Sequence, residues 1–270
     1  NGEPFIVDAL NRGASDVINM SRRDFATFSH EYFNHPTEHC VLIGVTGTNG
    51  KTSVVYFTVQ LLNKLNKKSL SIGTLESELT TPESWDTLSK IANHITQGGS
   101  HVVMEVSSHG IDQLRVDGFQ FDVKCLTNIS EDHLDYHGSF DAYKATKMGF
   151  MNSKPGVSIY SDSVDDIDPK YYPQLSGVFH KKNISTAVQI CRTLGFELSE
   201  ILPVLATIDA PPGRFESVDF KQPFSVIIDF AHTPDGLAFV LDAALDMVGG
   251  CKDRLHVVFG CGGDRDQSKR

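Results

Sequence analysis

Short apolar runs alternate with amphipathic stretches along the first part of the chain. Apolar runs occur at residues 41–45 (VLIGV), 101–106 (HVVMEV) and 123–129 (VKCLTNI), each short enough for a buried strand. Apolar residues recur every three or four positions from Lys51 onward and again over residues 139–152. The pattern predicts strands at the three runs and helices at the two amphipathic stretches.

Strands that alternate with helices favour a parallel sheet with helices on both faces. A second unit is predicted near residues 210–216 (APPGRFE), where two prolines and a glycine interrupt the pattern. A strand at 225–230, a helix from Pro234 to Met247 and a strand at 255–260 follow. We therefore expect an α/β fold in which a parallel sheet is followed by the start of a Rossmann-like domain.

Bulk composition narrows the class of protein. The chain has 270 residues, 40% of them hydrophobic, and a formal net charge of -10. It has no dense Lys/Arg block, which argues against a nucleic-acid or membrane partner and favours small ligands. Its five cysteines form no CxxC pair, as expected of reduced thiols. With no apolar stretch of about 20 residues and no signal-like N-terminus, we expect a cytoplasmic protein.

The segment GTNGKTS at residues 47–53 lies between the first predicted strand and helix. A glycine-rich turn that leads into a helix directs backbone N–H groups towards one point, where an anion such as phosphate is favoured. Lys51 would add positive charge, and the Thr52 hydroxyl could bind magnesium. The spacing departs from the common P-loop because Val45 stands where a glycine is usual, so a plain connecting turn is the alternative. We expect a central P-loop-type sheet.

Acidic and histidine residues follow the next two predicted strands. Glu105 ends the run HVVMEV, and the loop TNISEDHLDYHG after the third run includes Glu131, Asp132, His133, Asp135 and His137. Ligands of parallel sheets collect at the carboxyl ends of strands, so these groups could hold magnesium or transfer protons. For Glu105, the alternative is a solvated acid at the end of a strand. For the loop, it is a set of carboxylates that cap the following helix. The HxxxH spacing is not typical of structural zinc.

Lys147 lies on the apolar side of the helix predicted over residues 139–152, where Ser139 is the expected N-cap. A lysine near a buried face can lose its proton if desolvation outweighs its preference for charge. The alternative is a surface lysine whose stem covers apolar surface while its amine reaches water.

Eight motifs taken together resemble the Mur ligase family, and in particular its E-type branch: GTNGKTS, TTPES, EVSSHG, TNISEDHLDYHG, YKATK, APPGRFE, DFAHTPD and FGCGGDRD. The similarity covers nearly the whole chain. It implies that residues 1–38 are the remnant of a UDP-binding N-terminal domain and linker. Residues 39–212 would form the central ATP-binding domain, and 213–270 would begin a truncated C-terminal domain that binds an amino acid.

The resemblance implies an ATP-dependent ligase of peptidoglycan synthesis. Such an enzyme transfers the γ-phosphate of ATP to a carboxylate of UDP-N-acetylmuramoyl-L-alanyl-D-glutamate, and the amine of an amino acid attacks the acyl phosphate. The added amino acid would be meso-diaminopimelate rather than L-lysine, on general prevalence. Cell-wall biogenesis, cell shape and cell division would depend on this reaction. A cytoplasmic monomer with ATP, two magnesium ions and a carbamylated lysine is implied.

The resemblance also assigns roles to individual residues. Those at ATP would be Gly47, Thr48, Asn49, Gly50, Lys51, Thr52, Ser53, Asn183, Arg214, Asp229 and His232. Those at the muramoyl precursor would be Thr80, Thr81, Ser107, Gln113 and Arg115. Metal ligands would be Thr52, Glu105, His133 and Lys147 as its carbamate, and the catalytic group would be Lys51, Glu105, His133 and Lys147.

Two departures from the family pattern keep other readings open. The chain ends before the family's Asp-Asn-Pro-Arg motif, and it is shorter than usual between residue 75 and TTPES and between Asp168 and Leu175. A nucleotide-binding fragment without ligase activity is therefore one alternative. A folate polyglutamate ligase is another, although EVSSHG and DHLDYHG argue against it. A GTPase is disfavoured because no NKxD motif follows the phosphate loop.

Overall fold

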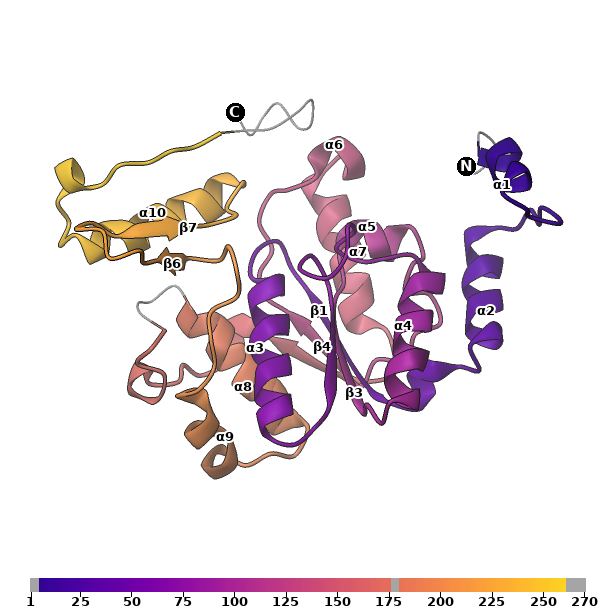
Figure 1. Ribbon diagram of the computed structural model, residues 1–270, viewed down its shortest axis with the longest axis horizontal. Coiled ribbons are helices and arrows are strands. Elements are labelled where there is room, and N and C mark those ends of the chain that lie inside the picture. The colour runs from indigo at the N-terminus through magenta and orange to yellow at the C-terminus, as the bar shows by residue number, and fades with distance from the viewer. Residues whose placement is uncertain (1–4, 176–179, 261–270) are drawn as a thin grey trace.

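The computed structural model describes residues 5–175 and 180–260 (Figure 1). The strand order of its main sheet is β2-β3-β1-β4-β5, and every pair in it is parallel. The strands are β1 (Val41–Thr46), β2 (Ser69–Ile72), β3 (His101–Glu105), β4 (Val123–Leu126) and β5 (Val157–Tyr160). The α/β fold with a central parallel sheet is confirmed.

Helices cover both faces of this sheet, as expected (Figure 1). The helices are α1 (Ile6–Asn11), α2 (Arg22–Tyr32), α3 (Lys51–Lys64), α4 (Ser84–Thr96), α5 (Ser108–Asp112), α6 (Leu134–His137), α7 (Phe140–Asn152), α8 (Lys181–Thr193), α9 (Leu198–Leu205) and α10 (Pro234–Met247). Side chains alternate across β1, so Ile43 and Val45 pack towards α3, α8 and α9, whereas Leu42 packs towards α4 and α7. All three are fully buried.

The register of the sheet brings three loops together at its carboxyl edge. In β1, Val45 is level with Glu105 of β3 and with Cys125 of β4. The chain leaves β1 at Thr46, β3 at Glu105 and β4 at Leu126, so the three following loops start side by side. These are the loops in which the sequence predicted chemistry.

The predicted helices at Lys51, 139–152 and 234–247 are confirmed, and Ser139 caps α7 by accepting from the Ala142 N–H. The predicted strand at 123–129 ends earlier, at Leu126, because the chain then turns towards the phosphate loop. Strands β2 and β5 and helices α4, α8 and α9 had not been predicted.

The second unit differs more from its prediction. Only residues 226–228 of the predicted strand at 225–230 pair, forming β7 (Val226–Ile228) antiparallel to β6 (Glu216–Val218). The prediction of a strand at 255–260 is wrong: this segment forms no strand, and Val258 is fully exposed. A strand forms only where a neighbour satisfies its backbone groups, and none of the described strands lies beside this one. The glycine-rich segment after residue 260 lies outside the described residues.

Helix α2 packs against α4 on the side of the molecule away from α10 (Figure 1). Trp85 of α4 contacts the rings of Phe28, Tyr32 and Phe33, with centroid distances of 6.1, 4.7 and 4.8 Å. The N-terminal segment is therefore joined to the central sheet through an aromatic contact. Over residues 5–175 and 180–260, the helices are too short or too polar to cross a membrane.

Two glycines, Gly44 of β1 and Gly149 of α7, differ in the space that surrounds them. A Cβ on Gly44 of β1 would lie 2.7–2.8 Å from the Phe121 and Phe150 rings, whereas one on Gly149 of α7 would meet nothing within 4 Å. We expect Gly44→Ala to lower the free energy of unfolding by about 1–3 kcal/mol through overpacking. Gly149→Ala should raise it by about 0.5–1 kcal/mol because alanine favours a helix interior. Urea denaturation of both variants checks this, and equal effects would contradict it.

Candidate functional site

The loop between β1 and α3, residues 47–50, has a shape that requires glycine at two positions. Gly47 has a φ of 144°, and a Cβ there would lie 1.9 Å from Thr127 Oγ1. Gly50 has a φ of 86° and would place a Cβ 2.7 Å from Asn183 Oδ1. Both positions therefore need a residue without a side chain, and the loop can lead directly into the N-terminus of α3.

The loop after β4 holds this phosphate loop in place. Thr127 Oγ1 donates to Asn49 O at 2.6 Å, and the Asn49 N–H donates to Asn128 Oδ1 at 2.9 Å. On the other side, Thr48 Oγ1 donates to Ser130 O at 3.1 Å. These hydrogen bonds fix the side chain of Thr48 and the backbone of Asn49. The loop therefore has its shape before any ligand binds.

Two lysines meet at one carbonyl oxygen, that of Gly47. Lys51 Nζ donates to it at 2.9 Å and also to Thr48 O at 2.8 Å, while Lys147 Nζ donates to it at 2.8 Å. Lys147 is 1% exposed, and its amine lies 4.7 Å from the centroid of the Tyr143 ring. The structure thus brings the predicted phosphate-binding lysine and the predicted reactive lysine together.

This arrangement favours the neutral form of Lys147. Burial and then the positive charge of Lys51 lower the pKa of Lys147 well below its ordinary value, and Asp132 opposes them. Burial also lowers the pKa of Lys51, but there the carboxylates of Glu105 and Asp132 favour the charged form. Lys51 is therefore the better candidate for a permanent cation, and Lys147 for a free amine.

Glu105 is 1% exposed and lies beneath the start of α3. Its carboxylate accepts from Thr52 Oγ1, with both oxygens at 3.1 Å, and from the Thr74 N–H at 2.8 Å. The Thr52 hydroxyl also accepts from Arg214 Nη2 at 3.1 Å. A buried carboxylate at the end of β3 and a hydroxyl in the first turn of α3 thus face the same point.

His133 lies in the loop after β4, next to the buried Asp132. The Asp132 carboxylate accepts from the His133 N–H at 2.8 Å and lies 3.4 Å from His133 Nε2. The His133 ring also contacts the His109 ring, with centroids 4.6 Å apart. The sequence singled out Asp132 only as part of a polar loop, but its charge acts on Lys51 and on Lys147.

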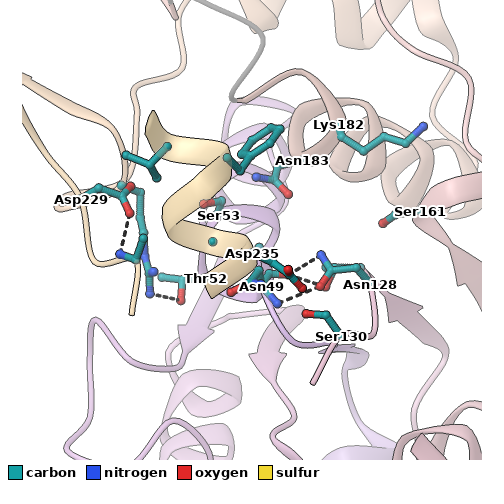
Figure 2. Close-up of a pocket in the computed structure, with 17 residues that line it drawn as sticks. Asn49, Thr52, Ser53, Asn128, Ser130, Ser161, Lys182, Asn183, Asp229 and Asp235 are labelled. Atoms are coloured by element: carbon teal, nitrogen blue, oxygen red, sulfur yellow. Dashed lines mark hydrogen bonds between the residues drawn. The ribbon is translucent and has the colours of Figure 1, made fainter. Parts of the chain in front are cut away.

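A pocket of about 350 Å³ opens between the phosphate loop, α8 and the segment from Arg214 to α10. Figure 2 shows Asn49 and Asn128 facing each other there, with Asp229 and Asp235 contributed from the C-terminal part. The pocket is lined by Asn49, Gly50, Thr52, Ser53, Thr127, Asn128, Ser130, Ser161, Lys182, Asn183, Arg214, Asp229, Ala231, Asp235, Gly236, Phe239 and Val240. Its size and mixed polarity suit a nucleotide.

The pocket is lined by seven of the eleven residues that were predicted to bind ATP, but not by Gly47, Thr48, Lys51 or His232. Gly47, Thr48 and Lys51 belong to the neighbouring phosphate loop and the start of α3, whereas His232 lies in the C-terminal part. That side chain is exposed, and Nδ1 lies 3.1 Å from Phe230 O. Asp229 accepts from the N–H groups of Phe215 and Ala231, at 2.7 and 2.6 Å, so it shapes the turn that presents Arg214. Sequence reasoning gave no role to Lys182, Asp235 or Phe239, because nothing local marks them as neighbours of the phosphate loop.

The residues predicted to bind the second substrate gather beyond Glu105. Thr81 Oγ1 donates to Ser107 Oγ at 3.0 Å, and Thr80 Oγ1 lies 3.2 Å from Thr74 Oγ1. Arg115 Nη1 donates to Thr81 O at 2.8 Å, and Nη2 donates to Gln113 Oε1 at 2.6 Å. The five predicted residues thus form one polar cluster at the carboxyl edge of the sheet, in which Thr81 is fully buried.

The donor set fits magnesium rather than a transition metal. Within residues 5–175 and 180–260, no three His, Cys, Asp or Glu side chains converge on a point that could hold a metal. Magnesium commonly binds through one carboxylate, waters and ligand phosphates, so Thr52 and Glu105 suffice for a site completed by a nucleotide. His133 is 39% exposed and can reach solvent near the same edge.

Comparison with known families matches two domains in succession. The Mur ligase middle domain matches residues 45–190, and the Mur ligase glutamate ligase domain matches residues 213–270. Together these matches cover more than half of the chain.

Related proteins extend this match over the full chain. A protein from Geobacillus kaustophilus named UDP-N-acetylmuramoyl-L-alanyl-D-glutamate--2,6-diaminopimelate ligase is 32% identical, with 100% of this chain and 70% of the relative covered. A protein of the same name from Fusobacterium nucleatum is 31% identical over 100% of this chain and 69% of its own. The first alignment runs over 346 positions, so the relative carries segments that this 270-residue chain lacks.

Solved structures confirm the fold. A structure of a UDP-N-acetylmuramoyl-L-alanyl-D-glutamate--2,6-diaminopimelate ligase matches 96% of this chain and 64% of its own, with a TM-score of 0.65 and 23% identity. Mycobacterium tuberculosis folylpolyglutamate synthase, solved with ADP and AMPPCP, matches 83% of this chain and 70% of its own, with a TM-score of 0.66 and 17% identity. The fold is thus shared by proteins whose names differ in substrate.

The lowered pKa of Lys147 predicts a dependence of stability on pH. In carbon-dioxide-free buffer, we expect Lys147→Met to raise the free energy of unfolding of the nucleotide-free protein. The unfolded state binds this proton more tightly than the native state, so the gain is largest at low pH and vanishes as the pH approaches 10.5, the ordinary value. Between the depressed pKa and that value, the gain should fall by roughly 1.4 kcal/mol per pH unit.

Urea denaturation over a range of pH, from about 6 to 10, measures this difference. Lys144→Met is the matched control, because Lys144 is exposed on the same helix. A gain that is the same at every pH would contradict the burial of a titrating amine.

Proposed function

Because the chain belongs to the Mur ligase family, we propose that it is an ATP-dependent ligase that joins a carboxylate to the amine of an amino acid. The observation that carries this proposal is the meeting of Lys51 and Lys147 at the Gly47 carbonyl, beside the Thr52–Glu105 pair. A phosphate-binding loop alone would support nucleotide binding only. A second, buried amine at the same point would be useful in a ligase, because as a carbamate it could help to hold a cation between two anionic reactants.

For the substrates, we propose UDP-N-acetylmuramoyl-L-alanyl-D-glutamate and meso-diaminopimelate, the compounds in the names of the relatives. L-Lysine is the alternative amino acid. The reaction would serve peptidoglycan synthesis in the cytoplasm, and through it cell shape and cell division. The chain covers 70% of the Geobacillus kaustophilus relative, and we propose that this part has the ligase activity. We expect a monomer.

ATP would lie with its phosphates against residues 47–53 and its base and ribose in the pocket. The N–H groups at the start of α3 point into the loop, and Lys51 lies beside it, so negative charge is favoured there. Structures of related fold contain ADP, among them the MurF ligase from Thermotoga maritima, which has a TM-score of 0.63 and 18% identity. Asn183, Arg214 and Asp229 would contact the nucleoside side of ATP, with His232 close by on the same turn.

Magnesium fits at Thr52 and Glu105, with a second ion at His133. When bound, these ions would neutralise the charge of the phosphates and of the acceptor carboxylate, which otherwise repel each other. Glu105 is held in place by Thr52 and by the Thr74 N–H, so its carboxylate is oriented before a cation arrives. The Arg214 contact with the Thr52 hydroxyl would have to open when that hydroxyl takes a metal.

Lys147 would react with carbon dioxide. The neutral amine would attack the carbon, so that a C–N bond forms while one C=O π bond opens and its electron pair moves to oxygen. The nitrogen would then lose one proton to water, which leaves a carbamate anion. Its low pKa makes the neutral amine available, because burial and Lys51 both disfavour the protonated form. After reaction, the repulsion between the two lysines becomes an attraction, and the carbamate can help to hold a cation.

Thr80, Thr81, Ser107, Gln113 and Arg115 would hold the muramoyl precursor at the far side of Glu105 from the nucleotide pocket. Arg115 is 12% exposed and is held by Thr81 and Gln113, so its guanidinium is oriented for an anionic group. This placement puts the acceptor carboxylate near the γ-phosphate, at the edge where β1 and β3 end.

A folylpolyglutamate synthase is the second candidate, because its structure matches this fold about as well as the Mur ligases do. The two candidates differ in the acceptor molecule that they use, so the acceptor requirement of the reaction distinguishes them. Phosphate release from ATP should require the muramoyl dipeptide precursor and an amino acid, and a folate with glutamate should not replace them. If the folate supports turnover and the precursor does not, the proposal is wrong. If ATP binds but neither acceptor is used, the chain is a nucleotide-binding fragment.

The carbamate proposal gives a direct prediction about activity. We expect Lys147→Ala to lower the ligation rate by about 100-fold or more, because a charged group at the reacting phosphates is lost. Removing bicarbonate should slow the wild type, and restoring it should recover the rate. Lys144→Ala, three residues away on the exposed side of α7, should keep wild-type activity. A Lys147→Ala variant with unchanged activity would remove the carbamate from the mechanism.

A further inference from the structure

Glu83, just before α4, lies between two arginines from distant parts of the chain. Its Oε2 accepts from Arg22 Nη1 at 3.0 Å, and its Oε1 lies 3.1 Å from Arg115 Nε. Arg22 is the first residue of α2, in the N-terminal segment, whereas Arg115 follows α5. One carboxylate therefore joins the N-terminal segment to a residue proposed to bind the precursor.

The contacts around this carboxylate hold Arg115 from several sides. Arg22 Nη1 also donates to Gln113 O at 3.3 Å, and Ser84 Oγ donates to Arg115 O at 3.0 Å. The turn before Arg115 requires Leu114 at a φ of 58°, an uncommon conformation for a residue other than glycine. Arg115 is thus set in one orientation by a strained turn and by polar partners, among them a carboxylate shared with Arg22.

We propose that Arg22 is a positioning residue of the precursor site and that it acts through Glu83. Without Arg22, the carboxylate would have one arginine as its partner and could draw the Arg115 guanidinium away from an incoming anion. With Arg22 present, Glu83 is shared, and the remaining N–H groups of Arg115 stay available. The docking of α2 on α4 therefore controls how well the precursor binds. This inference depends on the proposed function, since it concerns the same substrate.

The chain offers a matched control one residue away. Arg23 lies on the same helix, and its Nε is 3.2 Å from Asp117 Oδ2, in an ion pair that shares no atom with Glu83. Arg22→Gln and Arg23→Gln remove the same charge from the same helix. Any effect of net charge or of helix stability should be common to both, whereas loss of the Glu83 contact is confined to Arg22→Gln.

The contact between α2 and α4 contains an intrinsic fluorescent probe. Trp85, its single tryptophan, is two residues after Glu83 and packs on α2 through Tyr32 and Phe33. Its emission reports whether α2 remains docked in each variant. Calorimetric titration with UDP-N-acetylmuramoyl-L-alanyl-D-glutamate then measures the affinity for the precursor, and titration with ADP and magnesium measures the affinity of the nucleotide pocket.

We expect Arg22→Gln to weaken binding of the precursor by about tenfold, the order expected when one charge-assisted hydrogen bond is lost. Arg23→Gln should stay within about twofold of the wild type, and neither variant should change the affinity for ADP. In a Glu83→Gln background, adding Arg22→Gln should weaken binding by no more than about twofold, because the two residues then no longer act together.

The outcomes separate this inference from the proposed function. If the wild type binds the precursor and Arg22→Gln binds it as well as Arg23→Gln does, the positioning role is wrong while the substrate stands. If the tenfold loss persists in the Glu83→Gln background, Arg22 does not act through Glu83. If the wild type does not bind the precursor, the proposed substrate fails and the inference fails with it.

Discussion

The candidate site is built around a single shared hydrogen-bond acceptor, the carbonyl oxygen of Gly47. Two lysine amines donate to that oxygen, although Lys147 is 100 residues away from it in the chain. Two ammonium groups so close repel each other strongly where water is scarce, and the repulsion is relieved when one amine is neutral. The structure favours a neutral Lys147, because its side chain is buried and Lys51 adds a positive charge beside it, whereas the Glu105 and Asp132 carboxylates support the charge on Lys51.

That shared oxygen is in place because the phosphate loop is clamped from outside. Thr127 and Asn128, after β4, bond to Asn49, and Tyr143 on α7 lies 2.9 Å from the Thr48 hydroxyl. The same helix carries Lys147, so the loop and the buried amine are held by one packed unit. Glycine at position 47 makes the approach of the β4 loop possible. Preorganisation of this kind lowers the cost of ordering a site when charged ligands bind.

Local electrostatics here run against the bulk charge. The chain carries a formal net charge of -10, yet the point where anions are expected has Lys51, Arg214 and the start of α3 around it. Similar folds serve proteins named for muramoyl and for folate substrates. In the proposed function, the phosphate loop would bind the nucleotide, while the acceptor would be bound by separate residues beyond Glu105, where Arg115 and its partners lie. Substrate choice can therefore change without disturbing the nucleotide site.

The sequence by itself determined the three central strands of a parallel sheet, helices α3 and α7, the phosphate loop and the roles open to Lys51, Glu105 and Lys147, because periodicity and short motifs are local properties. Only the tertiary structure decided that Lys51 and Lys147 share one oxygen, that Asp132 acts on both, and that Arg22 reaches Glu83 over a separation of 61 residues. It also decided that residues 255–260 remain unpaired, since an apolar run becomes a strand only beside a neighbour. Long-range contacts depend on which distant segments become neighbours in the fold, and a local pattern does not give that order.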